Sequence, residues 1–467
     1  GNIGANPNGD TTSPGDQMIV EGNTSGITKV LVTNTGGNGA RTVEGIKLIT
    51  VNGASTGDFI KKGRIVAGAY DYDLVRGQGM NSGNWYLTSS TGEPPVLFDP
   101  EPAPTTPDVP VIPEVPAIPD VPVIPDVPVI PDVPEMPGPV PAPIVAQVRP
   151  EAAAYVDNLY AAYSLFNITL QDRMGGARGV DSDRNEQSGL WLRQTGEHLR
   201  SRDSSGQNNT RSNRYVTQLG SDVVRWSSNG QDRWLFGVMA GYANQNGKTR
   251  NHINDYSARS SVNGYSAGIY GTWLQDGDDN PGAYVDLWGQ YNWFNNSVKG
   301  ESLTGETYRS NGVTVSVEAG YSWKVGESAN QLYFIKPQGQ ITWGNVQADK
   351  YVETNGTRVT FSGEGNVQSR LGIKGAMKGK KHTEEDGKVH SMSPFVEINW
   401  LHNTHDFDTS LDGMHVSKAG IRNLAELKTG IEGSMGDGVD LWGNISQQIG
   451  AEGFRNTQAT IGIKMAF

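Results

Sequence analysis

The chain has 467 residues, no cysteine, 60 glycines, 25 prolines and a formal net charge of −12. The absence of cysteine excludes disulfide scaffolds, thiolate metal sites and cysteine nucleophiles. The acidic balance argues against a nucleic-acid-binding protein, which needs a basic face to neutralise phosphates. The abundance of glycine, tyrosine and tryptophan favours β structure with many turns.

Membrane and export signals come next, because they decide where the chain works. No apolar run approaches the roughly 18 residues of a transmembrane helix. A membrane β-barrel stays possible, because its strands alternate lipid-facing and lumen-facing residues and have modest hydropathy. The start, GNIGANPNGD, lacks the basic and apolar regions of a signal peptide. We therefore expect the natural N-terminus to lie upstream.

Residues 1–92 alternate short β-branched runs with Gly and Asn turns, at 27–34, 44–53, 63–77 and 84–90. This pattern is typical of stacked short strands, as in the end of a β-solenoid. The last rung of a solenoid exposes an edge and needs large capping side chains. We expect that cap to consist of four aromatic residues: Tyr70, Tyr72, Trp85 and Tyr86.

Residues 93–149 form a proline-rich segment, with proline at every third position from Pro107 to Pro137. This spacing matches the three-residue turn of polyproline II, and acidic residues recur at every sixth position. We expect a stiff acidic spacer; residues 102–143 would reach about 130 Å at about 3.1 Å per residue. The alternative is a PxxP ligand of a proline-binding domain, although no basic residue flanks the repeat.

Residues 149–176 predict one helix, with Pro150 in its first turn, several alanines, and Gly175 and Gly176 at its end. Its apolar side chains fall on one stripe: Tyr155, Leu159, Ala162, Phe166 and Leu170. The alternative is an amphipathic helix packed on a globular core, but no α/β or helical partner sequence follows.

From about residue 188 the pattern has period two to the end of the chain. It predicts roughly twelve strands, an even number as bacterial outer-membrane barrels require. The expected strands are 189–200, 214–226, 234–245, 264–275, 283–294, 312–325, 332–344, 367–379, 393–403, 425–435, 439–450 and 457–467.

These strands have one apolar and one polar face, which a soluble β-sandwich also has. Two features favour a membrane barrel: strand lengths above ten residues, and tryptophans near strand ends, where a membrane interface favours them, at Trp273, Trp293, Trp323, Trp343 and Trp400. The polar face is then expected to line the lumen, through Asp286, Glu397, Glu426, Lys428, Glu432 and Lys464.

The final strand is the most specific feature. Apolar residues alternate with Thr460, Gly462, Lys464 and Ala466, and the chain stops on an aromatic residue. An exposed strand of this kind is an aggregation liability in a soluble protein. It resembles the C-terminal signature that the assembly machinery of Gram-negative outer membranes reads, carried here by Ile461, Ile463, Met465 and Phe467.

The order of a solenoid-like end, a proline-rich spacer, a helix and a barrel ending in Phe resembles the autotransporter (type V secretion) family, in its pertactin-like and diffuse-adhesin-like branch. The resemblance covers nearly the whole chain. It implies that residues 1–92 are the autochaperone end of a passenger, 93–149 a linker, 150–176 a helical plug in the lumen, and 177–467 a monomeric β-barrel. It also implies outer-membrane lipid, the BAM assembly machinery and periplasmic chaperones as partners, and residues 1 to about 149 at the cell surface.

The function implied by the resemblance is export and anchoring of the protein's own passenger without ATP at the outer membrane. The leading expectation for the passenger is an adhesin with a host surface or matrix ligand. The alternative is an anchored surface esterase or protease whose active site lies upstream of residue 1. A general diffusion porin is a third possibility, which the plug argues against.

Catalytic and metal motifs carry little weight, and we expect no enzyme activity, cofactor or metal. The sequence GYSAG at 264–268 matches a nucleophile elbow, but Ser266 lies inside a period-two run with no helix after it. His402 and His405 follow a strand, where surface histidines are more common than metal ligands. Some relatives cut themselves at a paired Asn in the helix; here only Asp157 and Asn158 come near, and we expect no cleavage within 150–174.

Overall fold

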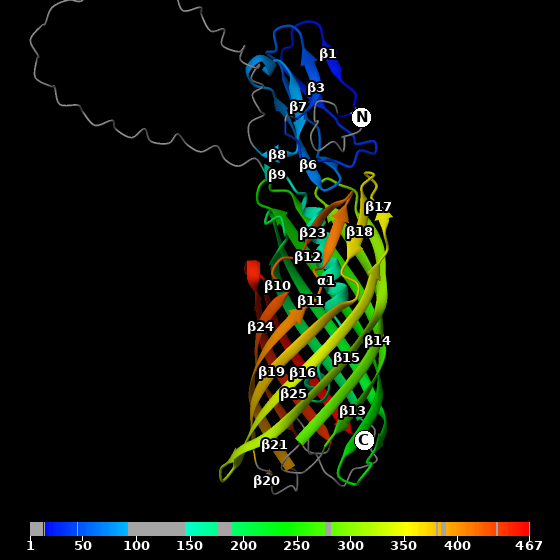
Figure 1. The fold of residues 1–467 in the computed structure, drawn as a ribbon, viewed down its shortest axis with the longest axis vertical. Coiled ribbons are helices and arrows are strands. Elements are labelled where there is room, and N and C mark those ends of the chain that lie inside the picture. The colour runs from blue at the N-terminus through cyan, green and yellow to red at the C-terminus, as the bar shows by residue number, and fades with distance from the viewer. Residues whose placement is uncertain are drawn as a thin grey trace, which may run out of the picture.

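In the computed structural model of the chain, a β-barrel carries a small β domain at one end (Figure 1). The structure describes residues 13, 15–43, 45–91, 145–175, 189–275, 282–379, 382–383, 389–435 and 438–466. The last strand ends at the opposite end of the barrel from the N-terminal β domain, which is the name used here for residues 15–91. Within the described ranges, no helix has the length and apolarity needed to cross a membrane.

The N-terminal β domain begins with two stacked rungs of parallel strands. Met18 pairs with Ile49, Thr24 with Ser55 and Ile27 with Asp58, which is the same offset of 31 residues each time. A constant offset between parallel strands is the register of a solenoid. The strands of the two rungs are β1 (Met18–Val20), β2 (Ile27–Val30), β3 (Ile46–Val51) and β4 (Asp58–Lys61).

An antiparallel meander closes the second rung. Strands β5 (Ile65–Ala67), β6 (Tyr70–Arg76) and β7 (Trp85–Thr88) extend the first sheet in the order β1-β3-β7-β6-β5, and a 3-10 turn, η2 (Gly79–Asn81), links β6 to β7. All four predicted capping aromatics lie in this meander. Tyr72, Trp85 and Tyr86 are buried, whereas Tyr70 is half-buried and forms a backbone bridge to Val148, just before α1.

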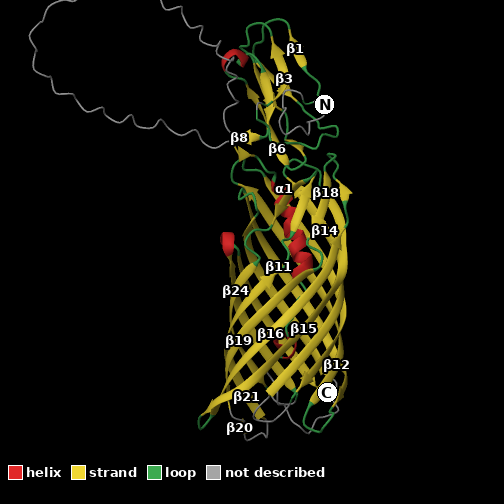
Figure 2. Ribbon diagram, viewed as in Figure 1, coloured by secondary structure: helices red, strands yellow, loops and turns green. Residues whose placement is uncertain are grey.

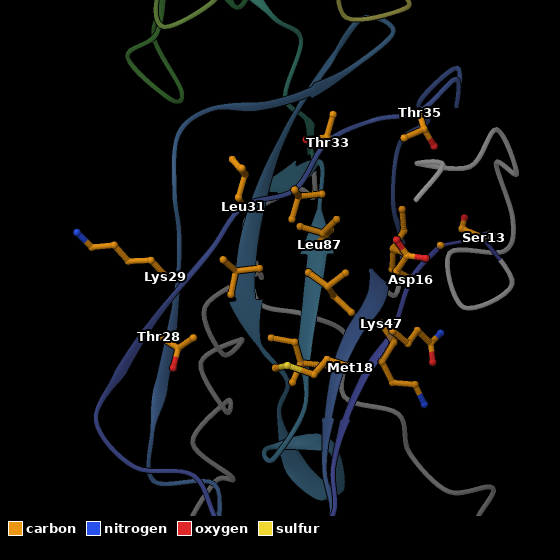
Figure 3. Close-up of a pocket in the computed structure, with 17 residues that line it drawn as sticks. Ser13, Asp16, Met18, Thr28, Lys29, Leu31, Thr33, Thr35, Lys47 and Leu87 are labelled. Atoms are coloured by element: carbon orange, nitrogen blue, oxygen red, sulfur yellow. The ribbon is translucent and has the colours of Figure 1, made fainter.

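The first rung leaves the interior of the solenoid open. A cavity of about 570 Å³ lies between β1, β2 and β3, with apolar side chains such as Met18, Leu31 and Leu87 around it (Figure 3). Leu31 is 69% exposed and Ile27 is 72% exposed. The outer edge of β1 and β2 is therefore unpaired and apolar among the described residues.

The two ends of the proline-rich segment lie side by side. Strand β8 (Ser90–Thr91) pairs antiparallel with β9 (Val145–Ala146), with Ser90 opposite Ala146 and Thr91 opposite Val145. The expected rod at 93–144 lies outside the described residues. The two ends of this segment meet, because Thr91 and Val145 are cross-strand partners, and the stiff spacer stays a prediction.

We expect deletion of 92–144 to leave the N-terminal β domain in place. Thr91 and Val145 are cross-strand partners, so in the deletion variant an introduced two-residue Asn-Gly turn can join them directly. Loop-closure entropy favours the shorter loop by about 3 kcal/mol. Limited proteolysis of the full chain checks this: the deletion variant should keep the protection of residues 15–91, and a domain that becomes protease-sensitive would contradict the prediction.

The predicted single helix is two helices. α1 (Pro150–Ser164) ends before α2 (Leu170–Met174), and the five residues between them are not helical. Thr169 begins α2 through a capping box in which Asp172 bonds back to the Thr169 backbone. The connector carbonyls are occupied by the barrel: Gln290 donates to Phe166 at 2.8 Å and Gln340 donates to Ile168 at 2.9 Å. Side chains from distant strands therefore replace the helical hydrogen bonds.

The barrel has twelve antiparallel strands, as predicted. Each pairs with its neighbour in sequence, and β10 closes the sheet against β26. The strands from β11 to β16 have 18–22 residues and are longer than predicted, because they continue toward the N-terminal β domain. Their bounds are β10 (Gly189–Arg202), β11 (Asn208–Trp226), β12 (Arg233–Asn251), β13 (Ser257–Leu274), β14 (Gly282–Gly300), β15 (Glu306–Glu327), β16 (Gln331–Ala348), β19 (Asn366–Gly379), β21 (Val389–Asn403), β24 (Asn423–Ser434), β25 (Val439–Gly450) and β26 (Arg455–Ala466).

The outer wall has an apolar band between two aromatic girdles. Trp226 and Trp234 stack at one end with ring centroids 5.7 Å apart, and Tyr242, Tyr265 and Trp293 follow one another at the other. The residues from Trp234 to Tyr242 cover about 26 Å of strand, or about 20 Å of height at a tilt of about 40°. This height matches the apolar band of outer-membrane barrels, which is about 25 Å.

Two hairpins fold over the barrel mouth below the N-terminal β domain. They form a four-stranded sheet in the order β17-β18-β22-β23. Its strands are β17 (Tyr351–Val352), β18 (Arg358–Ser362), β22 (Asp408–Leu411) and β23 (Met414–Ser417). Two shorter elements complete the barrel, β20 (His382–Thr383) beside β21 and the 3-10 turn η3 (Ala451–Gly453) between β25 and β26.

Candidate functional site: the plugged lumen

The lumen holds residues 150–174, which we call the plug (Figure 2). Pro150 at the first helical position and a run of alanines favour helix formation in α1. All residues from Pro150 to Tyr163 are buried, so the helix has no solvent face. The expectation of a single apolar stripe is too narrow, since the barrel encloses α1 on every side.

Aromatic and aliphatic side chains fill the space around α1. Tyr163 packs on Phe407 with centroids 4.7 Å apart, and Phe166 stacks on Phe294 at 5.7 Å. Leu159 and Ala162 lie in the same core cluster, whereas Tyr155 lies in a second cluster nearer the mouth and Leu170 in one near α2. The plug is therefore held by direct packing along α1.

One buried charge pair anchors the middle of α1. Asp157 accepts from Lys418 at 2.9 Å, and both side chains are at most 3% exposed. The carboxylate also accepts from Ser212 at 2.6 Å, Gln245 at 2.9 Å and Ser260 at 3.1 Å. These donors come from β11, β12, β13 and the segment after β23, so the pair ties the helix to opposite parts of the wall.

Lumen-facing glycines make room for the plug. A Cβ on Gly247 would lie 2.2 Å from the Ser260 hydroxyl and 2.5 Å from an Asp157 carboxylate oxygen. A Cβ on Gly300 would lie 1.9 Å from a Glu151 oxygen. These distances are far below van der Waals contact, so another residue at either position requires the Ser260, Asp157 or Glu151 side chain to move.

We expect Gly247→Val to destabilise the plugged barrel by about 1–3 kcal/mol through overpacking. Gly196 is the matched control, because nothing lies within 4 Å of a Cβ added there. Urea unfolding followed by the heat-modifiable band of the folded barrel measures the difference. Equal midpoints for Gly247→Val and Gly196→Val would show that the glycine serves no packing purpose.

The lower plug, α2, makes charged contacts with the wall. Asp172 lies 3.2 Å from Arg193 and 3.9 Å from Lys428, Gln171 donates to Glu432 at 2.6 Å, and Arg173 pairs with Asp286. The cation of Arg173 also lies 3.8 Å from the centroid of Tyr270. Every polar residue of α2 thus has a partner on the barrel wall.

All six predicted lumen residues are buried inside the wall. Asp286, Lys428 and Glu432 contact the plug. The other three pair with the wall itself: Glu397 with Arg370, Glu426 with Asn399 and Gln448, and Lys464 with Asp222 at 3.0 Å. Sequence reasoning missed Lys418 and Asp157 as a pair, since 261 residues separate them and Lys418 lies outside the predicted strands, in an isolated bridge to Asp203.

A second polar cluster joins the plug to the N-terminal β domain; we call Arg64, Asp71, Arg149, Glu151 and Glu353 the junction network. Arg64 donates to Asp71 at 2.6 and 2.9 Å and to Glu151 at 2.7 and 2.9 Å. Burial opposes the charge of Arg64, but the carboxylates of Glu151 and Asp71 outweigh it and raise the pKa of Arg64. Its guanidinium therefore stays charged between two carboxylates.

The junction network continues onto the barrel hairpins. Arg149 pairs with Glu353 in the β17–β18 hairpin and lies 3.6 Å from Glu151. Tyr155 donates to Glu353 at 2.7 Å. One chain of contacts thus links the N-terminal β domain, the first turn of α1 and the barrel mouth.

The segment before α1 also docks on the mouth. Val148 donates its N–H to Gln207 at 3.0 Å, and its carbonyl accepts from Asn251 at 2.7 Å. On its other side, Asp71 donates its N–H to the carbonyl of Gln147 at 3.0 Å. Residues 145–149 therefore lie between the N-terminal β domain and the barrel and bond to both.

The motifs considered for chemistry have structural surroundings. Ser266 is buried in the middle of β13, opposite Gly241 and Asn292, with no turn at its position. His402 accepts from or donates to Asn423, and His405 contacts Thr404. No group of three or more His, Asp or Glu residues suited to a metal occurs in the parts of the chain that the structure describes.

Comparisons with known proteins agree on one family. The family described as Autotransporter beta-domain matches residues 190–446, and Autochaperone Domain Type 1 matches residues 4–74. The uncharacterized protein YdeU of Escherichia coli K12 is 40% identical over 98% of this chain and 93% of YdeU. The autotransporter adhesin AIDA-I of Escherichia coli is 33% identical over 97% of this chain and 32% of AIDA-I.

Length and structure refine this match. The uncharacterized protein YuaQ of Escherichia coli K12 is 42% identical over 98% of this chain, which spans only 31% of YuaQ. The crystal structure of the transport unit of AIDA-I superposes with a TM-score of 0.61 and 36% identity, over 69% of this chain and all of that one. The chain therefore belongs to the autotransporter family: residues 189–466 form its outer-membrane translocator barrel, and the N-terminal β domain is part of a passenger at the cell surface.

Proposed function

We propose that this translocator exports and anchors an adhesive passenger, and that the N-terminal β domain is the part of that passenger nearest the membrane. The observation that carries the proposal is the path of the chain. It runs from the N-terminal β domain through the lumen as the plug and enters β10 at the far end of the barrel. A passenger that has crossed the pore from the periplasm leaves the chain in this arrangement.

The adhesive character rests on the relatives and on the open solenoid. AIDA-I is named as an adhesin, and its similarity extends over 97% of this chain. The exposed apolar edge of β1 and β2 supports further rungs stacking before residue 18. Such stacking extends the passenger away from the membrane, where it reaches host surfaces.

Display of the full gene product on a non-adherent laboratory strain tests the proposal. An N-terminal epitope should become accessible to antibody on intact cells, and the cells should bind epithelial monolayers above a vector control. Removing the part of the passenger that precedes the N-terminal β domain, while keeping residues 15–467, should abolish binding but keep the heat-modifiable barrel. Ester or peptide hydrolysis by the same cells without binding would instead favour a surface enzyme, and an inaccessible epitope would contradict export.

We further propose that the BAM machinery, supplied by periplasmic chaperones, inserts the barrel as a monomer by reading its last strand. Ile461 and Met465 face outward and are 64% and 43% exposed, and Ile463 is partly buried on the same face. Phe467 lies outside the described residues. Closure of all twelve strands within one chain supports a monomeric barrel.

We expect Phe467→Ala to reduce assembly strongly, because it removes the terminal aromatic residue of the proposed signal. The amount of heat-modifiable barrel in outer-membrane fractions should fall several-fold, while Ala466→Ser, a neighbouring change on the other face, should assemble like the wild type. Similar amounts for both variants would contradict a reading role for the terminal residue.

A further inference from the structure

A row of cations crosses the outer wall of the barrel on the side of the N-terminal β domain. The residues occupy directly paired positions on six neighbouring strands, β26 and β10 to β14. Arg200 pairs with both Arg455 and Arg211, Lys248 pairs with Arg211 and Arg259, and Arg259 pairs with Lys299. We call these six residues the cationic belt: Arg455, Arg200, Arg211, Lys248, Arg259 and Lys299.

The belt is unfavourable for the barrel taken alone. Like charges directly opposite each other in a sheet are destabilising. The row is also unusual in this chain, whose net charge of −12 means that acidic residues outnumber basic ones. All six side chains are exposed. No carboxylate among the described residues forms an ion pair with any of them; the nearby pair of Arg250 and Asp255 lies beyond the row. Five consecutive like-charged pairs without internal counter-ions indicate an external anion.

The height of the belt identifies the layer that it meets. Lys248 comes six residues after Tyr242, and Lys299 comes six residues after Trp293 of the same aromatic girdle. Six residues span about 20 Å of strand, or about 15 Å above the girdle at a tilt of about 40°. Lys248 and Lys299 therefore lie outside the hydrocarbon, at the height of lipid saccharides on the outer face. Because the row runs perpendicular to tilted strands, it comes closer to the hydrocarbon toward Arg455, which is paired with the exposed Ile449.

The wall between girdle and belt is rich in side-chain amides. Asn244, Asn263 and Asn295 are aligned on β12, β13 and β14, and Asn246 pairs with Asn213 in the next row. Amides donate and accept, which suits sugar hydroxyls. The guanidinium group of Arg and the ammonium group of Lys suit phosphate oxygens. A polar surface with amides below and cations above matches a saccharide that carries phosphate groups.

We propose that the cationic belt binds the phosphate groups of the phosphorylated glycolipid in the outer leaflet, lipopolysaccharide. Six strands at about 4.8 Å spacing make a contact about 25 Å wide, enough for more than one phosphate group. Bound phosphates neutralise the cross-strand repulsion, so the glycolipid stabilises the extended strands that support the passenger. This glycolipid-binding site, the cationic belt, is on the outer wall of the barrel and makes no use of the plug.

The test uses the full chain and two triple variants of equal charge change. The belt variant is Arg211→Gln, Lys248→Gln, Arg259→Gln. The control is Lys62→Gln, Lys350→Gln, Arg358→Gln, three exposed cations at the same end of the molecule but outside the belt. Each protein is reconstituted in phosphatidylcholine vesicles with and without lipopolysaccharide, and the melting temperature of the heat-modifiable band is measured.

The expected result is that lipopolysaccharide reverses the order of the melting temperatures of the belt variant and the wild type. In phosphatidylcholine alone the belt variant should melt at or above the temperature of the wild type, because like-charge pairs are gone. Lipopolysaccharide should raise the melting temperature of wild type and control by several degrees, and that of the belt variant by less than half as much. The amount of lipopolysaccharide that co-purifies with the barrel should fall at least threefold in the belt variant. The double variant Arg211→Lys, Arg259→Lys keeps the charges and should retain the wild-type amount.

Three outcomes overturn the proposal. One is an equal effect of lipopolysaccharide on the belt variant and the control. Another is equal binding of dephosphorylated lipopolysaccharide, which would place recognition on the sugars alone. The third is belt-dependent retention of heparin or DNA by intact cells without any effect of lipopolysaccharide, which would assign the belt to a soluble polyanion.

Discussion

Lys418→Met is expected to lower the free energy of unfolding of the barrel by about 3–5 kcal/mol, because it removes the ion-pair partner of the buried carboxylate of Asp157. The pair is 2.9 Å long and at most 3% exposed. Three neutral donors remain around Asp157, but none carries a balancing charge. Urea unfolding of the purified chain measures the loss, and planar-bilayer recordings should show more frequent openings of the loosened pore.

The double variant Asp157→Asn, Lys418→Met separates charge from packing. It removes the orphaned charge and keeps the amide within reach of Ser212 and Gln245, so we expect it to recover at least half of the lost stability. Lys350→Met, a change at an exposed lysine, is the matched control. A Lys418→Met variant that unfolds within about 0.5 kcal/mol of this control would show that the plug is held by packing alone.

Arg64→Met is expected to release the N-terminal β domain from the barrel mouth. The change leaves the carboxylates of Asp71 and Glu151 buried beside each other without the cation that joins them. Breaking a buried pair in this way costs about 3–5 kcal/mol. Hydrogen exchange should accelerate in residues 69–76 and 145–151 while the strands of the barrel keep their protection.

The control for Arg64→Met is Arg422→Met. Arg422 pairs with Asp406 at 2.8 Å, but both side chains are about half exposed, so the pair should contribute no more than about 1 kcal/mol. The triple variant Arg64→Met, Asp71→Asn, Glu151→Gln should regain much of the protection. Unchanged exchange in Arg64→Met would mean that the pairing of β8 with β9 and the contacts of Val148 suffice to hold the domain.

The strands of the barrel could be predicted because each face of a barrel wall has one environment. Leu427 and Ile431 are exposed on the outer wall, whereas Lys428 and Glu432, each the next residue along the strand, are buried inside, as the alternation in 425–435 indicates. The extensions of β11 to β16 were missed, since above the girdle both faces are polar and the alternation disappears, as in the run from Asn208 to Asn213.

The sequence by itself determined the twelve strands, the helical character of α1 and the polar interior, because these depend on local periodicity against lipid and lumen. Tertiary structure decided what depends on contacts between distant residues. The break before Thr169 follows from barrel side chains that take the connector carbonyls. The return of the proline-rich segment follows from the pairing of Thr91 with Val145. The cationic belt exists only through strand register, which aligns residues as far apart as Arg200 and Arg455.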